Sequence, residues 1–276
     1  MPGKAALPVR ARGCKTILAR YDRAMTFLRL LLILAAGLLC DSLVLAQVEI
    51  PALRAKAEKG DASAQNNLGV AYQNGQGLVK DDAEAVKWYR KAAEQGDASA
   101  KNNLGFMFQY GQGVPKDEAE AVKWFRKSAD QGRADAQYNL GVMYGDGSGV
   151  PKDDAEEVKW YRKAAEQGHA PAQYNLGDAY AFGQGVSKDE ASAVKWYRKA
   201  AEQGVSNAQV NLGIAYANGR GVPKDEMEAY KWSLLARAQG NEDAKQTIVI
   251  LEGRLTPAQR EEGQRRAREF KAGQPR

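Results

Sequence analysis

A period of 36 residues runs through most of this chain. A Leu-Gly pair, a Gly-x-Gly motif and a tryptophan each recur five times at this spacing. The tryptophans are Trp88, Trp124, Trp160, Trp196 and Trp232. Repetition at a fixed period of roughly 20–50 residues is typical of stacked units, each of which buries its apolar face only against its neighbours. The period therefore predicts an elongated array with one continuous core.

Each unit contains two helical patterns joined by a glycine-rich turn. In the first unit, apolar residues recur at the spacing of a helix over 64–72 and again over 85–93. Gly75 ends the first pattern, and Asp81 with Glu84 has the form of a capping box at the start of the second. Gly69 stands inside the first helix, where glycine costs about 1 kcal/mol relative to alanine, so we expect a neighbouring helix to pack closely there.

These patterns predict an all-α solenoid of five 36-residue helix-turn-helix repeats, with capping helices at both ends. We place a leader at 1–46, an N-terminal cap at 47–59, the repeats at 60–239 and C-terminal capping helices at 240–276. A single helix pair cannot bury its tryptophan alone, whereas stacked pairs give every unit a neighbour.

The leader has the features of a secretory signal. Arg29 precedes an apolar run over 30–40, and Val44-Leu45-Ala46 suits signal peptidase. We expect translation to start at Met25 and cleavage to follow Ala46, which predicts a periplasmic or secreted protein with no stable membrane span. An uncleaved anchor is the second interpretation, although the run is shorter than the about 20 apolar residues of a membrane helix.

The remaining chain has almost no net charge. The whole sequence carries 40 basic and 34 acidic residues, of which the leader holds seven and two, so 33 and 32 remain after residue 46. Basic residues of the second helices alternate with glutamates, which indicates a solvated face. We therefore expect no nucleic-acid partner. Both cysteines lie in the leader, so we expect no disulfide, thiolate metal site or cysteine nucleophile in the mature chain.

Few residues are suited to catalysis. His169 is the only histidine, and it lies in a turn where we expect an ordinary surface residue. Ser192 and Lys195 match the Ser-x-x-Lys pattern of penicillin-interacting enzymes, but the other units carry a Glu/Lys pair at these positions. Acidic pairs such as Asp81-Asp82 fit helix capping better than a metal site. We therefore expect no enzyme activity, metal or cofactor, and keep a β-lactam or peptidoglycan hydrolase as one alternative.

The motif order resembles a known family. Each unit reads A-x-x-x-L-G-x-x-Y, then G-x-G, then D-x-x-x-A-x-x-W-Y and A-A-x-x-G, which is similar to the Sel1-like repeat, a relative of the tetratricopeptide repeat. The resemblance covers about 60–240. Phe108, Ser128 and Ser192 depart from the usual Tyr, Ala and Glu. The resemblance implies a right-handed α-superhelix that scaffolds or recruits other proteins.

By the same resemblance, one arc of each first helix lines a concave groove. An asparagine recurs at the centre of this arc, while its neighbours differ between units and include aromatic residues. We expect an exported adaptor that binds a protein partner there; a glycan-binding module is a further alternative, because aromatic grooves also stack sugars. Two structural roles remain open, since the asparagines can hydrogen-bond neighbouring helices and the aromatics can pack between repeats. The predicted binding residues are Asn67, Asn103, Phe106, Tyr110, Tyr138, Asn139, Tyr174, Asn175, Asp178, Phe182 and Asn211.

Overall fold

The computed structural model describes residues 50–270, and within them it is entirely helical, without a strand. The leader, with its predicted signal and cleavage site, lies outside the described residues. A helical segment over 50–58 precedes five helix pairs. The first helices of the pairs are α2 (Ala62–Asn74), α4 (Ala98–Tyr110), α6 (Ala134–Asp146), α8 (Ala170–Phe182) and α10 (Ser206–Asn218). The second helices are α3 (Asp82–Glu94), α5 (Glu118–Ala129), α7 (Asp154–Glu166), α9 (Glu190–Glu202) and α11 (Glu226–Ala238), and α12 (Asp243–Glu252) and α13 (Pro257–Glu269) follow.

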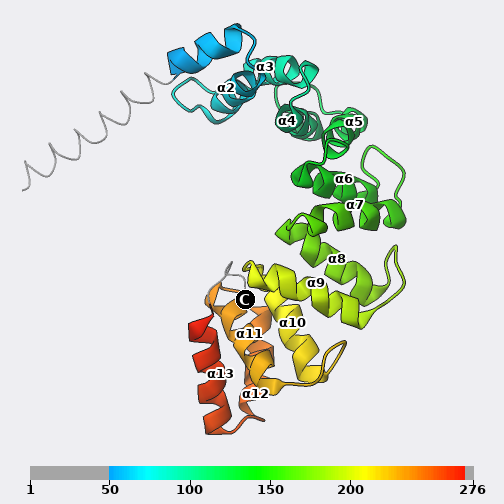
Figure 1. Cartoon of the computed structure of the whole chain (residues 1–276), viewed down its shortest axis with the longest axis vertical. Helices are drawn as coiled ribbons and strands as arrows, with labels where there is room; N and C mark the ends of the chain where they lie inside the picture. Colours follow the sequence, from blue (N-terminus) through cyan, green and yellow to red (C-terminus); the bar gives the residue numbers. More distant parts are fainter. Residues whose placement is uncertain (1–49, 271–276) are drawn as a thin grey trace, which may run out of the picture.

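The helix pairs stack in chain order into an open arc (Figure 1). From α2 to α11, each helix packs mainly against the helices next to it in sequence, whereas α13 packs against α11. At the N-terminal end of the arc, α2 and α4 lie on the inner side and α3 and α5 on the outer side (Figure 1). The predicted all-α solenoid is confirmed.

The aspartates predicted to start the second helices do so. The Asp81 carboxylate accepts a hydrogen bond from the Glu84 N–H at 2.9 Å, and Asp117, Asp153, Asp189 and Asp225 cap their helices in the same way. The reciprocal half of the capping box was predicted wrongly. The Glu84 carboxylate bonds to the Lys87 ammonium instead, because an opposite charge one turn further on is within reach on this exposed surface.

Close packing at the glycine inside each first helix is confirmed. A Cβ placed on Gly105 would lie 2.5 Å from the ring of Phe125, which packs across the glycine from the second helix. Tyrosines occupy the same place in the first, third and fourth repeats, but Ser233 does so in the fifth. The tryptophan of the third repeat, Trp160, is 3% exposed and lies in the core, as predicted.

Buried glutamines join consecutive repeats. The Gln137 side-chain amide donates to the Ala129 carbonyl at 3.2 Å, and its oxygen accepts from the Gln167 amide at 2.7 Å. Gln65, Gln173 and Gln209 are held in the same manner. In the second repeat Lys101 takes this place and reaches Gln131 at 2.9 Å. An unpaired buried amide would be costly, so each joint is specified by its hydrogen bonds as well as by its apolar contacts.

Basic residues of the second helices also pack, which modifies the solvated face predicted for them. Arg162 donates to the Tyr180 hydroxyl of the next repeat at 3.0 Å, and three equivalent Arg/Tyr pairs occur along the array. Phe108 lacks a hydroxyl, and Arg90 lies over its ring instead, at 5.5 Å. Lys163 lies 4.0 Å from the Trp160 ring centre and covers the tryptophan from the solvent side.

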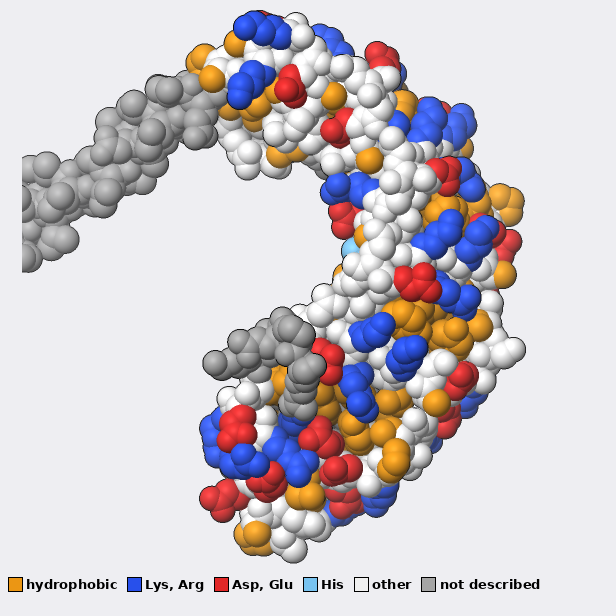
Figure 2. All heavy atoms as spheres, in the orientation of Figure 1, with side chains coloured by type: hydrophobic (Ala, Val, Ile, Leu, Met, Phe, Trp, Pro, Cys, Tyr) orange, Lys and Arg blue, Asp and Glu red, His pale blue; other side chains and the backbone are white. Residues whose placement is uncertain are grey.

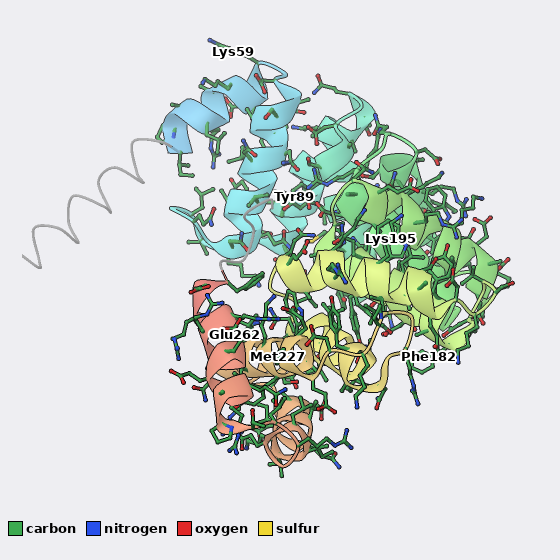
Figure 3. The ribbon with its side chains drawn as sticks, turned by 60° about the horizontal axis from the view of Figure 1, so that its bottom comes forward. Lys59, Tyr89, Phe182, Lys195, Met227 and Glu262 are labelled. Carbon is green, nitrogen blue, oxygen red and sulfur yellow. The ribbon has the colours of Figure 1, made fainter. Side chains whose placement is uncertain are left out.

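The last helix closes the C-terminal end of the array. α13 begins with a capping box between Thr256 and Gln259, and it lies beside α11 (Figure 3, with Glu262 and Met227 labelled). Phe270 meets the ring of Trp232 edge-on at 5.1 Å, and Arg266 bonds to Glu228 at 3.0 Å. Among residues 50–270, every helix is too short or too polar to cross a membrane.

Candidate binding surface on the first helices

Four positions on each first helix form one face, which is at least partly exposed except at the buried Asn102 and Val210. We call this the first-helix face; it comprises positions 66, 67, 70 and 74 of α2 and the equivalent positions of α4, α6, α8 and α10. All eleven predicted binding residues belong to it. Figure 2 shows the hollow that the arc encloses.

The recurring asparagine bonds across the joint between repeats. The Asn103 amide donates to the Asn66 side-chain oxygen at 3.0 Å, and the Asn139 amide donates to Asn102 at 3.0 Å. Within residues 50–270 no first helix precedes the one that carries Asn67, and Asn67 is exposed. The structural role considered for these asparagines is therefore present from the second repeat onward, while their binding role stays a prediction.

In the fourth and fifth repeats the asparagine keeps its place but changes partners. Asn175 hydrogen-bonds the Tyr161 hydroxyl. Asn211 donates to the Asp178 carboxylate at 3.2 Å, and the Tyr197 hydroxyl donates to the same oxygen at 2.6 Å. Burial, with the nearby Asp178 charge, raises the pKa of Tyr174 to about 12. The two hydrogen bonds from Asn211 and Tyr197 hold Asp178 in place, and its carboxylate is a hydrogen-bond acceptor within the first-helix face.

Three of the predicted aromatic residues are half-buried and cover the rings of the second helices. Phe106 meets Phe125 edge-on at 5.3 Å, and Tyr138 stacks on Tyr161 at 5.6 Å. Tyr174 lies 6.1 Å from Tyr197, with the two rings tilted by 36°. Their contacts contribute to repeat stability in addition to any contact with a partner.

Two aromatic residues are exposed. Tyr110 at the end of α4 is 63% exposed, and Phe182 at the end of α8 is 78% exposed. They occupy equivalent positions two repeats apart, and Phe182 extends from the end of its helix in Figure 3. These two side chains are the most exposed aromatic residues of the first-helix face, although the Tyr110 ring also stacks on Phe106 at 6.3 Å.

Grooves bring several of the predicted residues together. A groove of about 320 Å³ between α8, α9 and α10 includes Phe182 and Asn211. A smaller groove of about 160 Å³ includes Asn175 and Asp178 beside Glu157, whose pKa is raised by burial. At the N-terminal end, a groove of about 650 Å³ runs past Asn67. The predicted residues therefore form separate clusters along the arc.

Comparison with known proteins identifies the repeat. A family model described as Sel1 repeat matches residues 62–97, 98–132, 134–169, 170–205 and 206–241. The chain belongs to the Sel1 repeat family. No match was found among curated proteins.

Solved Sel1 repeat structures resemble this chain. A Sel1 repeat protein from Oxalobacter formigenes is 38% identical, with 77% of this chain and 89% of that chain covered and a TM-score of 0.65. The protective antigen c5321 of uropathogenic Escherichia coli, which has the same repeat fold, is 27% identical over 82% and 72% of the two chains, with a TM-score of 0.38. A putative Sel1 repeat protein from Klebsiella pneumoniae is 21% identical over 72% and 97%, with a TM-score of 0.46.

The Ser-x-x-Lys motif of this Sel1 protein is part of a helix cap. The Ser192 hydroxyl donates to the Asp189 carboxylate at 2.6 Å, at the position where the other repeats carry a glutamate that bonds to lysine. Lys195 points to a different neighbour, since its ammonium lies 5.9 Å from the Trp196 ring centre. In the part of the chain that the structure describes, no three His, Cys, Asp or Glu side chains form a metal-binding group.

His169 differs from the surface residue that we predicted. Its side chain is 16% exposed, lies 4.8 Å from the Tyr138 ring and accepts a hydrogen bond from the Ala172 N–H through Nδ1 at 3.2 Å. It is the N-cap of α8. Burial lowers its pKa, although Asp135, 3.6 Å from Nε2, acts in the opposite direction. The His169 side chain is partly buried because it packs against the Tyr138 ring, at a position where the first two repeats have asparagine.

Proposed function

We propose that this Sel1 repeat protein is an exported, non-catalytic adaptor that binds another protein through the first-helix face. The observation that carries the proposal is the pair of exposed aromatic residues, Tyr110 and Phe182, at equivalent positions on this face. Large aromatic side chains left in solvent are typical of contact surfaces, where they act as anchors.

The fold itself does not require aromatic residues there. The equivalent positions in the first, third and fifth repeats hold Asn74, Asp146 and Asn218, which are all exposed. The frame beneath is held by the glutamine, asparagine and arginine contacts between repeats. The contacts between repeats stay the same while the exposed residues differ from repeat to repeat. This arrangement suits selective recognition, because an exposed residue can change without disturbing the core.

Export is proposed from the leader. Its basic residues, short apolar run and Val44-Leu45-Ala46 site favour cleavage after Ala46 and a periplasmic or secreted location. N-terminal sequencing of the protein recovered from the producing cell tests this directly: Gln47 is the expected first residue, and an intact leader in the membrane fraction would show an anchored protein.

Site-specific photo-crosslinking in the producing cell tests the adaptor function. Benzoylphenylalanine in place of Tyr110 or Phe182 is expected to capture the same protein. The control carries the probe in place of Val79, which is 87% exposed but lies in the connection after α2. Equal capture from all three positions would contradict the proposed surface.

Two results would favour the other functions. Retention on a peptidoglycan or oligosaccharide column, with no protein captured at either position, would indicate a glycan-binding module. Turnover of a chromogenic β-lactam that Ser192→Ala abolishes would indicate a hydrolase.

A further inference from the structure

The groove between α8, α9 and α10 combines an apolar wall with a free positive charge. We propose that it binds a short segment of the partner protein in which an apolar side chain lies next to a carboxylate; this rests on the adaptor function proposed above. Its volume of about 320 Å³ is at the low end of the range for ligand pockets, roughly 300–1,000 Å³, so it suits one or two side chains.

The apolar wall is supplied by two helices. Phe182 projects from the end of α8, and Ile214, which is 37% exposed, faces the groove from α10. Val194 of α9 is buried beneath them. Covering Phe182 and Ile214 with an apolar side chain removes both from water, which favours binding.

The polar groups beneath the groove are already occupied. Tyr197 and Asn211 both line it, and both donate to Asp178. They stabilise the joint between the fourth and fifth repeats, and the Tyr197 proton and the Asn211 amide are committed there. The charged group available for recognition lies on the rim.

The rim carries one free cation, Arg220. Within residues 50–270 its side chain makes no hydrogen bond or ion pair, whereas Lys188 and Glu190, also on the rim, pair with each other at 3.3 Å. The other repeats have no cation here: the equivalent residues are Gln76, Gln112, Ser148 and Gln184. A carboxylate on the bound segment would complement this charge.

The backbone that carries Arg220 is held in place. A Cβ on the next residue, Gly221, would lie 2.1 Å from the Glu190 carbonyl oxygen, so the turn rests directly on the start of α9. The Arg220 N–H also donates to the Ala215 carbonyl at 3.0 Å. A fixed turn lowers the entropy lost when a segment binds.

Selection from a phage library of random nonapeptides, with the purified protein as target, tests the proposal. We expect enrichment of peptides that carry an apolar residue beside Asp or Glu. An enriched peptide labelled with fluorescein should lose at least tenfold in affinity with Phe182→Asn or Arg220→Gln, measured by fluorescence anisotropy. Added salt should weaken binding to the wild type more than binding to Arg220→Gln.

The variants are chosen to preserve the fold, since each introduces a residue that other repeats carry at the same position. Val79→Ser is the matched control, because it removes an exposed apolar side chain outside the first-helix face and introduces the residue that the fourth repeat carries there, Ser187; it should leave peptide affinity unchanged. Unfolding in urea checks that all three variants keep wild-type stability.

The proposal is overturned if no peptide is enriched, if the enriched peptides are basic, or if Phe182→Asn and Arg220→Gln bind them as tightly as the wild type. If a crosslinked partner binds both variants with full affinity, the groove proposal is wrong, but the adaptor function is still supported. Peptide binding that follows our expectation, without any protein captured at positions 110 and 182, would contradict the adaptor function instead.

Discussion

The second and third repeats meet at a joint, and the first-helix face lies beside it on the same helices. The two regions differ in how much their residues vary between repeats. At the joint, Gln137 bonds to Ala129 and Gln167, and the same contacts recur at other joints. On the face, Tyr110 of one repeat is followed by Asp146 of the next. Contacts that hold the repeats together recur, whereas the exposed positions change. The difference separates residues that specify the fold from residues available for recognition.

The largest expected effect belongs to the core. Trp160→Ala should lower the free energy of unfolding by about 3–5 kcal/mol, because a buried indole and its packing are lost. Phe182→Ala is the matched change on the face and should shift the urea midpoint little. Equal losses from the two changes would remove the distinction between joint and face.

A glycine substitution tests the close helix approach. Gly105→Ala should cost about 1–3 kcal/mol, since its Cβ would lie 2.5 Å from the Phe125 ring. Gly213→Ala is the control, because its nearest neighbour is the Ser233 hydroxyl at 3.0 Å, and the higher helix propensity of alanine, worth about 1 kcal/mol, offsets part of the strain. Similar urea midpoints for both variants would show that the aromatic ring does not enforce this packing.

Much of the architecture could be predicted from the sequence, because a period of 36 residues is visible without any knowledge of contacts. The aspartate caps and the buried tryptophans follow from local pattern. The bond from Gln137 to Ala129 across the joint could not be predicted, since a recurring polar residue has the same appearance on a surface and in a joint.

The candidate site was less predictable than the fold. Phe106 and Phe182 are both aromatic residues on the same arc, yet Phe106 packs on Phe125 and Phe182 is exposed. Phe106 lies next to Gly105, on which the Phe125 ring packs, whereas Phe182 is the last residue of α8. The groove containing Arg220 forms only when three helices from two repeats are assembled, so no local pattern reveals it.

The asparagines provide a smaller and more direct test of their two roles. Asn103→Ala should lower the free energy of unfolding by about 1 kcal/mol, because the bond to Asn66 is lost. Asn67→Ala should change it by less than about 0.5 kcal/mol, since Asn67 is exposed at the end of the array. A larger loss for Asn67→Ala than for Asn103→Ala, measured by urea unfolding, would contradict the inter-repeat role.

The smallest effect concerns pH. Because the folded state lowers the pKa of His169 below its ordinary 6.5, the neutral ring is favoured on folding. Its contribution to stability is complete above pH about 6.5 and is lost as the pH falls through the lower folded pKa. Urea midpoints should therefore fall more between neutral and mildly acidic pH for the wild type than for His169→Asn, which keeps a capping side chain. Parallel pH profiles would show that His169 is not the group responsible.

The central claim, that the face binds a partner while the joints hold the fold, is tested most directly by one double variant. Tyr110→Asn combined with Phe182→Asn should keep the wild-type urea midpoint and lose at least tenfold in affinity for the partner crosslinked at these positions, because each exposed anchor is worth about 1–3 kcal/mol of binding. A variant that unfolds much earlier than the wild type, or that retains full affinity for that partner, would contradict the claim.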